Sequence, residues 1–136
     1  MKIVIDTNCL ISCIGKKSLY RNVFDAFLES RFSICANHEM VLEYEETFVR
    51  FWGEEVTNNL MGLFEVSDNF EQVEVFYNFK LIEKDKDDNK FVDTFISSGA
   101  AYLISNDREI LRLQNISFPP LQILTLQEFS EMLKIK

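Results

Sequence analysis

Four acidic residues, far apart in the sequence, stand where a fold could direct them at one metal ion: Asp6, Glu43, Asp88 and Asp107. Asp6 directly follows a short apolar run, and Asp107 follows a second such run with two small polar residues between. The carboxyl ends of neighbouring parallel strands meet at one edge of a sheet, so we expect Asp6 and Asp107 to lie there. Carboxylates suit hard divalent cations. The pattern therefore predicts a divalent-metal site and an enzyme that acts on phosphodiesters.

The neighbours of Asp6 strengthen this prediction. Asp6, Thr7 and Asn8 place a carboxylate, a hydroxyl and an amide in succession at the end of a predicted strand, and all three groups carry oxygen. Each acid also has a purely structural explanation. An aspartate after a strand often caps a helix, which applies to both Asp6 and Asp107. Glu43 could simply be an exposed glutamate.

The acidic turn 85–89 leaves the third acid open among Asp85, Asp87 and Asp88. Helix capping or turn formation explains some of these residues. Asp88 precedes apolar residues by three, four and seven positions, so it shares their inward helical face. A carboxylate there needs a partner or a metal, because unpaired burial is costly. We therefore select Asp88, and we expect Asp93, which is off this face, to be exposed.

Apolar periodicity and turn residues predict alternating strands and helices. Short apolar runs predict strands at 2–6, 32–36, 101–105 and 122–124, with an alternating segment at 71–77. Periodicity and capping residues predict helices at 8–14, 19–30, 38–52, 54–67, from the acidic turn to 98, at 107–113 and from 125 onward. This alternation predicts an α/β/α sandwich around a mostly parallel sheet. Because Gly and Pro are scarce and no linker is evident, we expect one domain over 1–136.

Glu43 belongs to the predicted helix 38–52. We expect the apolar face of this helix to include Val41, Leu42, Phe48 and Val49. Glu43 adjoins that face, so it lies at the border between the core and water.

Composition excludes several classes of protein. With 136 residues, 47% hydrophobic content and 13 Phe, the chain can bury a real core. No stretch approaches the ~18 apolar residues that span a bilayer, and Asp6 comes too early for a signal peptide, so we expect a cytoplasmic protein. A net charge of −8 argues against non-specific coating of nucleic acid. It leaves room for an enzyme whose acids meet phosphate through Mg²⁺.

Cysteine and histidine give weaker signals. Cys9, Cys13 and Cys35 form no CxxC motif and should be reduced in the cytoplasm. Cys9 and Cys13 are four residues apart and could both bind zinc, but buried apolar-face cysteines are the more ordinary case. His38, the only histidine, follows a predicted N-cap residue, which favours a capping or surface role over acid–base catalysis.

In their order and spacing, four segments of the chain resemble the PIN-domain family, in particular the toxins (VapC-like ribonucleases) of bacterial toxin–antitoxin systems. The segments, which span nearly the whole chain, are 4–10 (VIDTNCL), 36–45 (ANHEMVLEYE), 85–91 (DKDDNKF) and 101–107 (AYLISND) with the following Ile110 and Leu111. Lys86 stands where many relatives carry proline, which changes no carboxylate.

The resemblance implies a Mg²⁺- or Mn²⁺-dependent ribonuclease with a three-layer α/β/α fold. It implies that the catalytic and metal-binding acids are Asp6, Glu43, Asp88 and Asp107, and that the supporting residues are Thr7, Asn8 and Ser105. Thr7 or Ser105 would support a ligand or a metal-bound water, and Asn8 would orient the site. The implied partners are an RNA substrate, an antitoxin protein and a second copy in a homodimer, with no membrane.

Two other functions fit parts of the sequence. A PIN-like module that binds nucleic acid or protein with little or no catalysis agrees with the charge of −8. A phospho-acceptor receiver domain is also α/β with acids at strand ends. That class needs an acid pair near the N-terminus and a lysine after a later strand. Here only Asp6 is near the start, and no lysine follows Ser105.

Overall fold

Five short parallel strands form the central sheet of the computed structural model, which describes residues 1–75, 82, 89–116 and 121–135. The strands are β1 (Lys2–Ile5), β2 (Ser33–Ala36), β3 (Phe70–Gln72), β4 (Tyr102–Ile104) and β5 (Ile123–Leu124). The helices are α1 (Thr7–Ile14), α2 (Arg21–Leu28), α3 (His38–Val66), α4 (Asn89–Ser98), α5 (Arg108–Ile116) and α6 (Leu126–Lys134). Each of these elements overlaps a predicted one. The predicted segment 71–77 is a strand only at its start, and its residues 76–77 and the acidic turn 85–88 lie outside the described residues.

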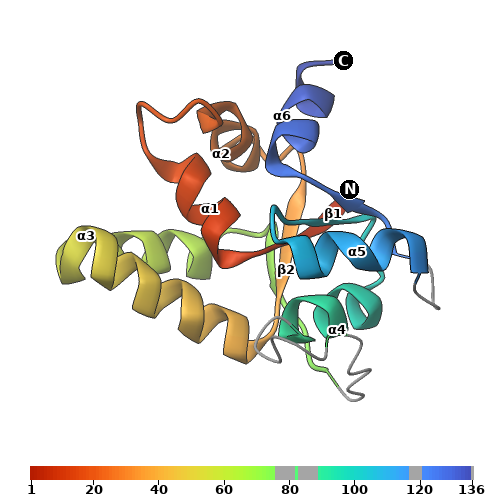
Figure 1. Ribbon diagram of the computed structural model, residues 1–136. Coiled ribbons are helices and arrows are strands. Elements are labelled where there is room, and N and C mark those ends of the chain that lie inside the picture. Colours follow the sequence, from red (N-terminus) through yellow and green to blue (C-terminus); the bar gives the residue numbers. More distant parts are fainter. Residues whose placement is uncertain (76–81, 83–88, 117–120, 136) are drawn as a thin grey trace.

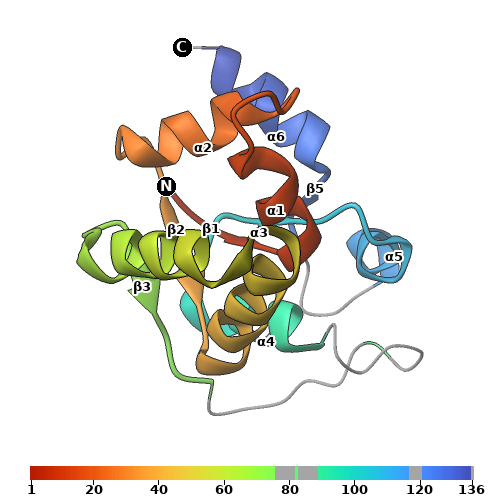
Figure 2. The same ribbon diagram turned by 90° about the vertical axis from the view of Figure 1, so that its left-hand side faces the viewer.

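Helices cover both faces of the sheet. Figure 1 shows α1, α2 and α3 on one side of the strands and α4 and α5 on the other. Figure 2 shows α2 and α6 next to each other, and these two helices are in contact. The predicted three-layer α/β/α sandwich around a parallel sheet is therefore confirmed.

The order of the strands, β3-β2-β1-β4-β5, reverses direction beside β1. The chain first builds outward from β1 through β2 to β3, and then returns to place β4 on the other side of β1. Ile5 pairs with Ile104, and the N–H of Asp6 donates to the carbonyl oxygen of Ile104 at 3.0 Å. The residues that follow β1 and β4 are thus neighbours at the point where such sheets bind ligands.

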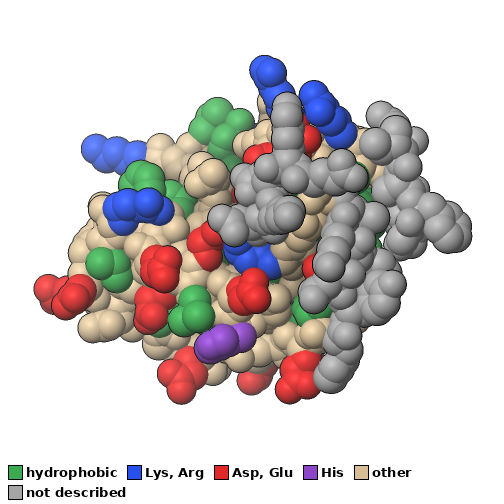
Figure 3. All heavy atoms as spheres, turned by 60° about the horizontal axis from the view of Figure 1, so that its bottom comes forward, with side chains coloured by type: hydrophobic (Ala, Val, Ile, Leu, Met, Phe, Trp, Pro, Cys, Tyr) green, Lys and Arg blue, Asp and Glu red, His purple; other side chains and the backbone are tan. Residues whose placement is uncertain are grey.

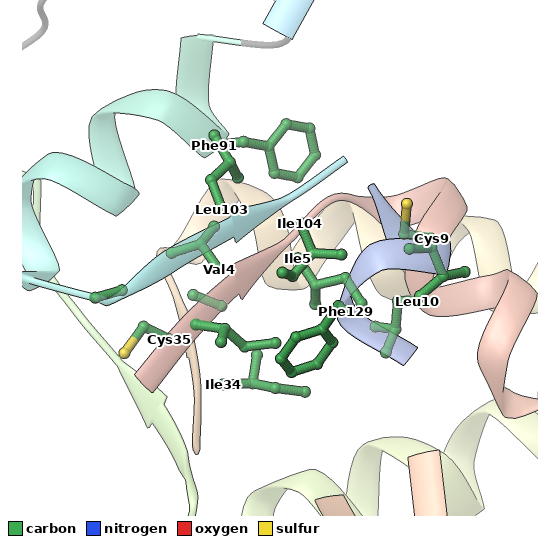
Figure 4. Packing of buried hydrophobic residues seen from close by; sticks show 14 of the residues in the cluster. Val4, Ile5, Cys9, Leu10, Ile34, Cys35, Phe91, Leu103, Ile104 and Phe129 are labelled. Carbon is green, nitrogen blue, oxygen red and sulfur yellow. The ribbon is translucent and has the colours of Figure 1, made fainter. Parts of the chain in front are cut away.

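The core lies on both faces of β1. Ile3, Val4 and Ile5 are all buried, which explains why this strand is a continuous apolar run and not an alternating one. Figure 4 shows side chains from β1, β2, β4, α1 and α6 meeting in this core, including those of Leu10 and Phe129. The strand that ends directly before Asp6 is therefore packed on both faces.

Helix α3 turns sharply at Gly53. This residue has φ 83° and ψ 173°, a backbone conformation that is essentially restricted to glycine. The Thr57 hydroxyl donates to the Gly53 carbonyl oxygen at 2.8 Å, and the rings of Phe48 and Phe64, one in each half of α3, lie 6.2 Å apart. The turn therefore folds the second half of α3 back on the first, in agreement with separate helices predicted at 38–52 and 54–67.

Two predictions of burial were wrong. Leu42 and Val49 are 44% and 39% exposed, because α3 turns Tyr44 into the core together with Phe48, whose predicted burial is confirmed. Asp93 was expected at the surface but is only 4% exposed. Helix α4 contacts β1, β2, β4 and α3, so it is covered on more than one side and buries residues that lie off its apolar stripe.

Within the described part of the chain, no helix combines the length and the apolar character needed to cross a membrane.

Two glycines of α3 provide a matched test of the turn. An added Cβ meets no heavy atom within 4 Å at either Gly53 or Gly62, so only backbone conformation distinguishes them. Gly53→Ala should lower the free energy of unfolding by about 1–3 kcal/mol, because alanine does not adopt this conformation. Gly62→Ala, in regular helix, should raise it by about 0.5–1 kcal/mol. Urea denaturation measures both changes. Equal effects of the two substitutions would contradict the assignment of the turn to Gly53.

Candidate functional site

Asp6 lies directly after β1 and caps helix α1. Its Oδ1 accepts a hydrogen bond from the backbone N–H of Cys9 at 2.8 Å, and its Oδ2 accepts one from the Ser105 hydroxyl at 2.5 Å. The residue is only 7% exposed. Both oxygens are thus fixed in direction, one by the first turn of α1 and the other by Ser105, the residue after β4.

The surroundings of Asp6 disfavour its negative charge. Burial raises the pKa of this carboxyl, and the nearby charge of Asp107 raises it further, whereas the hydrogen bonds from Ser105 and Cys9 lower it. The balance is a raised pKa, because the loss of water outweighs the hydrogen bonds. A bound cation would offset both the cost of burying the Asp6 charge and its repulsion from Asp107.

Asp107 is positioned by the same serine. Its N–H donates to Ser105 Oγ at 3.0 Å, so Ser105, which is fully buried, connects the two aspartates. Asp107 Oδ1 in turn accepts from the N–H groups of Glu109 and Ile110 at 2.8 and 3.4 Å and so caps α5. The capping role considered for Asp107 is therefore real. It also directs this carboxylate into the region beside Asp6.

Glu43 approaches from α3 and is held at both oxygens. Oε2 accepts a hydrogen bond from the Thr7 hydroxyl, and Oε1 lies 3.0 Å from Nζ of Lys90 on α4. Sequence reasoning did not identify Lys90. Lys90 and Glu43 are on different helices, so no pattern within one helix predicts their contact. In the sequence, Lys90 is marked only by its position next to the apolar residue Phe91. The prediction that Glu43 lies between core and water agrees with a side chain that is one-third exposed.

Tyr44, the residue after Glu43, anchors this part of α3 to the sheet. It is completely buried, and its hydroxyl donates to the carbonyl oxygen of Ile5 at 2.5 Å. Ile5 is the last residue of β1, immediately before Asp6. The position of Glu43 relative to Asp6 is therefore fixed through a buried hydrogen bond that the sequence analysis also did not identify.

These acids line one open pocket of about 700 Å³. Its lining residues are Asp6, Thr7, Asn8, Glu43, Glu46, Thr47, Arg50, Phe91, Asn106, Asp107, Arg108 and Glu109. Figure 3 shows the face on which α3 begins, where acidic side chains are spread over the surface with basic ones among them. The pocket likewise mixes acids with two arginines, so it offers groups for both a cation and a phosphate.

The structure brings three of the four predicted acids to this pocket. Asp88, with its alternatives Asp85 and Asp87, lies outside the described residues. Carboxylate, hydroxyl and amide oxygens are a donor set that fits Mg²⁺ or Mn²⁺. Among the residues described here, however, no three acidic, His or Cys side chains converge closely enough to form a complete metal site. The described acids thus supply the chemistry of such a site but not a closed set of ligands.

The other candidate groups lie elsewhere. Cys9 and Cys13 are buried in the core, where burial raises the pKa of the Cys13 thiol to about 12 and that of Cys9 also upward. Among the described residues, no group of three His, Cys, Asp or Glu side chains that could hold a metal ion includes them, so the structure does not support the zinc alternative. His38 is exposed at the start of α3 and is not among the residues that line the pocket.

The fold is similar to those of two solved structures. VapBC2 from Rickettsia felis, in complex with a DNA fragment from its promoter, matches with a TM-score of 0.65 and 17% identity over 92% of this chain and 98% of the other. VapC20 from Mycobacterium tuberculosis, a toxin that cleaves the sarcin–ricin loop, matches with a TM-score of 0.61 and 10% identity. That match covers 84% of this chain and 96% of VapC20. At these identities the likeness concerns the fold.

Sequence comparison identifies the family. None of the curated proteins has a sequence that matches this chain significantly. The family model of the PIN domain, by contrast, matches residues 2–109, a range that includes β1, β4, Glu43 and both aspartates at the strand ends. This chain therefore belongs to the PIN-domain family.

Proposed function

We propose that this protein is a divalent-metal-dependent endoribonuclease and the toxin of a toxin–antitoxin pair. The observation that carries the proposal is the arrangement of Asp6 and Asp107 at adjacent strand ends, joined through Ser105. Glu43 lines the same open pocket. A buried carboxylate with a raised pKa beside a second carboxylate is the environment that a cation would stabilise.

In this proposal the cofactor is Mg²⁺ or Mn²⁺, and the acids that would hold it are Asp6, Glu43, Asp88 and Asp107. When bound, such an ion polarises a phosphodiester and supplies a nucleophilic water at neutral pH. The protein's part is to fix the acids. Ser105 orients Asp6 and Asp107, Thr7 orients Glu43, and Asn8 lines the pocket next to them.

The substrate is proposed to be RNA, held by its phosphates. Arg50 on α3 and Arg108 on α5 both line the pocket, and each is exposed. Guanidinium groups bind phosphate oxygens in a bidentate manner, so these two arginines can hold the RNA backbone at the pocket. Local cations of this kind reconcile a phosphate-binding pocket with a net charge of −8.

Two solved structures with a similar fold support the toxin proposal. VapC20 is a toxin that cleaves the sarcin–ricin loop, and VapBC2 binds DNA from its promoter. We propose an antitoxin protein as the partner of this chain. Because this chain has a net charge of −8, a basic antitoxin would complement it. We also propose that residues 1–136 form a single domain, that two copies of the chain form a homodimer, and that the protein acts in the cytoplasm.

Asp6→Asn tests the enzyme directly. The wild-type protein should cleave generic single-stranded RNA with Mn²⁺ and not with EDTA. The variant should lose at least about 10- to 100-fold in rate, because a lost ligand costs no less than a lost supporting residue. A gel assay over a time course measures the cleavage.

Asp68→Asn is the matched control, because Asp68 is exposed and does not line the pocket. Its rate should equal that of the wild type. If the wild-type protein binds RNA tightly without metal and does not cleave it, the protein is a catalytically inactive binding module.

Asp6 also predicts a pH dependence of stability without metal. Burial raises the pKa of Asp6 above its unfolded value, so the ionised carboxylate lowers the free energy of unfolding at neutral pH. The lost free energy of unfolding is recovered as the pH falls through the folded-state pKa of Asp6 toward about 4, the ordinary pKa of an aspartate. Asp6→Asn should thus be more stable than the wild type in EDTA at pH 7, and the difference should shrink in acid. Urea denaturation across this range measures it.

Metal should reverse the order of these two proteins. At a Mn²⁺ concentration of 100 times the Kd, the wild type should gain about 2.7 kcal/mol, and the variant far less. A variant that is less stable than the wild type in EDTA at pH 7 would contradict the predicted cost of the Asp6 charge.

Arg108→Ala tests the phosphate contact. In an Asp6→Asn background, which prevents cleavage, this change should weaken the binding of single-stranded RNA of any sequence. The slope of log K against log salt concentration is negative for RNA binding, and its magnitude should decrease by about 0.7, the value for one phosphate contact on a single strand. Fluorescence anisotropy at several salt concentrations measures both effects. Arg112→Ala, on the same helix but outside the pocket lining, should leave the slope unchanged.

A further inference from the structure

Lys90 forms an unusually buried ion pair with Glu43. Its side chain is 10% exposed, whereas the basic partners of the other ion pairs in the described ranges are 26% exposed or more. Its Nζ lies 3.0 Å from Glu43 Oε1 and 4.9 Å from the centre of the Phe91 ring. Lys90 is not itself among the residues that line the pocket, but its neighbour Phe91 on α4 is, and its ammonium contacts a carboxylate that α3 presents to that pocket.

This pair occupies a carboxylate that the proposed cation needs. Glu43 Oε2 already accepts from Thr7, and Oε1 is next to Lys90, so both oxygens are engaged within the protein. A partly buried ammonium cannot move freely into water, because its desolvated charge requires a partner. Glu43 can therefore turn to a second cation only by loosening its contact with Lys90, and the ammonium then remains close by.

We infer that Lys90 is a positioning residue that holds Glu43 in the metal-free protein and limits the affinity of the pocket for divalent cations. The inference rests on the proposed function in taking Glu43 as a metal ligand. Its direction follows from the charges. One charge near a carboxylate changes its affinity for a proton by about tenfold to a thousandfold, and a divalent cation experiences the same repulsion from an ammonium more strongly. Removing the charge of Lys90 should therefore strengthen metal binding.

Mn²⁺ binding to the full chain tests this inference, measured as free Mn²⁺ by electron paramagnetic resonance. Lys90→Met should bind Mn²⁺ roughly tenfold more tightly than the wild type, and Lys90→Arg should stay within about twofold of it. In EDTA, Lys90→Met should melt at a lower temperature than the wild type, because Glu43 keeps its hydrogen bond from Thr7 but loses its ion pair. A lysine with a merely structural role would weaken Mn²⁺ binding when removed.

Lys134→Met is the matched control, because Lys134 forms an exposed ion pair with Glu131 on α6. It should leave the Mn²⁺ affinity unchanged. In a Glu43→Gln background, Lys90→Met should produce a smaller fold-change, since the two residues act together. Lys90→Gln replaces Lys90→Met if circular dichroism shows that the latter does not fold.

The outcomes separate this inference from the proposed function. Unchanged or weaker Mn²⁺ binding by Lys90→Met overturns the role of Lys90, even if the wild type cleaves RNA. An equal fold-change in the Glu43→Gln background overturns positioning through Glu43. Tighter binding by Lys90→Met supports the inference, even if the wild type binds Mn²⁺ without cleaving RNA. A wild type that binds no Mn²⁺ overturns both.

Discussion

The pairing of β1 with β4 is the constraint on which the site depends. It places Asp6 and Asp107 at neighbouring strand ends, and the buried Ser105 hydroxyl completes the connection by donating to one aspartate while accepting from the N–H of the other. The pairing is possible because the chain reverses direction beside β1 and returns to its open side. Any fold that placed β4 elsewhere would separate the two carboxylates.

Both aspartates also cap helices, so structural and chemical roles coincide in the same side chains. Asp6 caps α1 and Asp107 caps α5, each through Oδ1. A helix N-terminus favours an anion, which helps to offset the cost of burying Asp6. The offset is incomplete, since burial still raises the pKa of Asp6. The protein therefore retains an electrostatic cost at this point, as enzymes commonly do where a cation or substrate binds.

The opposite wall of the pocket depends on side chains from α3 and α4. The buried Tyr44 hydroxyl fixes α3 to the end of β1, which sets the position of Glu43, and Lys90 pairs with Oε1 of that glutamate. Two arginines at the pocket add positive charge. The result is a mixed pocket within an acidic protein, where local charge and not net charge decides what can bind.

The sequence by itself determined the local elements, because their signals lie within a few residues. Apolar runs predicted the strands, Asn37 and Thr125 predicted helix starts that the structure confirms, and the break near Gly53 was expected between two helices. The shared position of Asp6 and Asp107 also followed, since both end apolar strands of one parallel sheet.

Only the tertiary structure decided which faces are covered and which distant side chains meet. Periodicity identifies one apolar stripe, but α4 packs against several elements at once, so Asp93 is buried. For the same reason the choice between Leu42 and Tyr44 as a core residue of α3 depended on what lay opposite. Lys90 and Glu43 are polar residues on separate helices, and no pattern within either helix encodes their contact. Such contacts arise when the sheet fixes the helices in space, which is why the chemistry of the pocket exceeds what the four acids alone predicted.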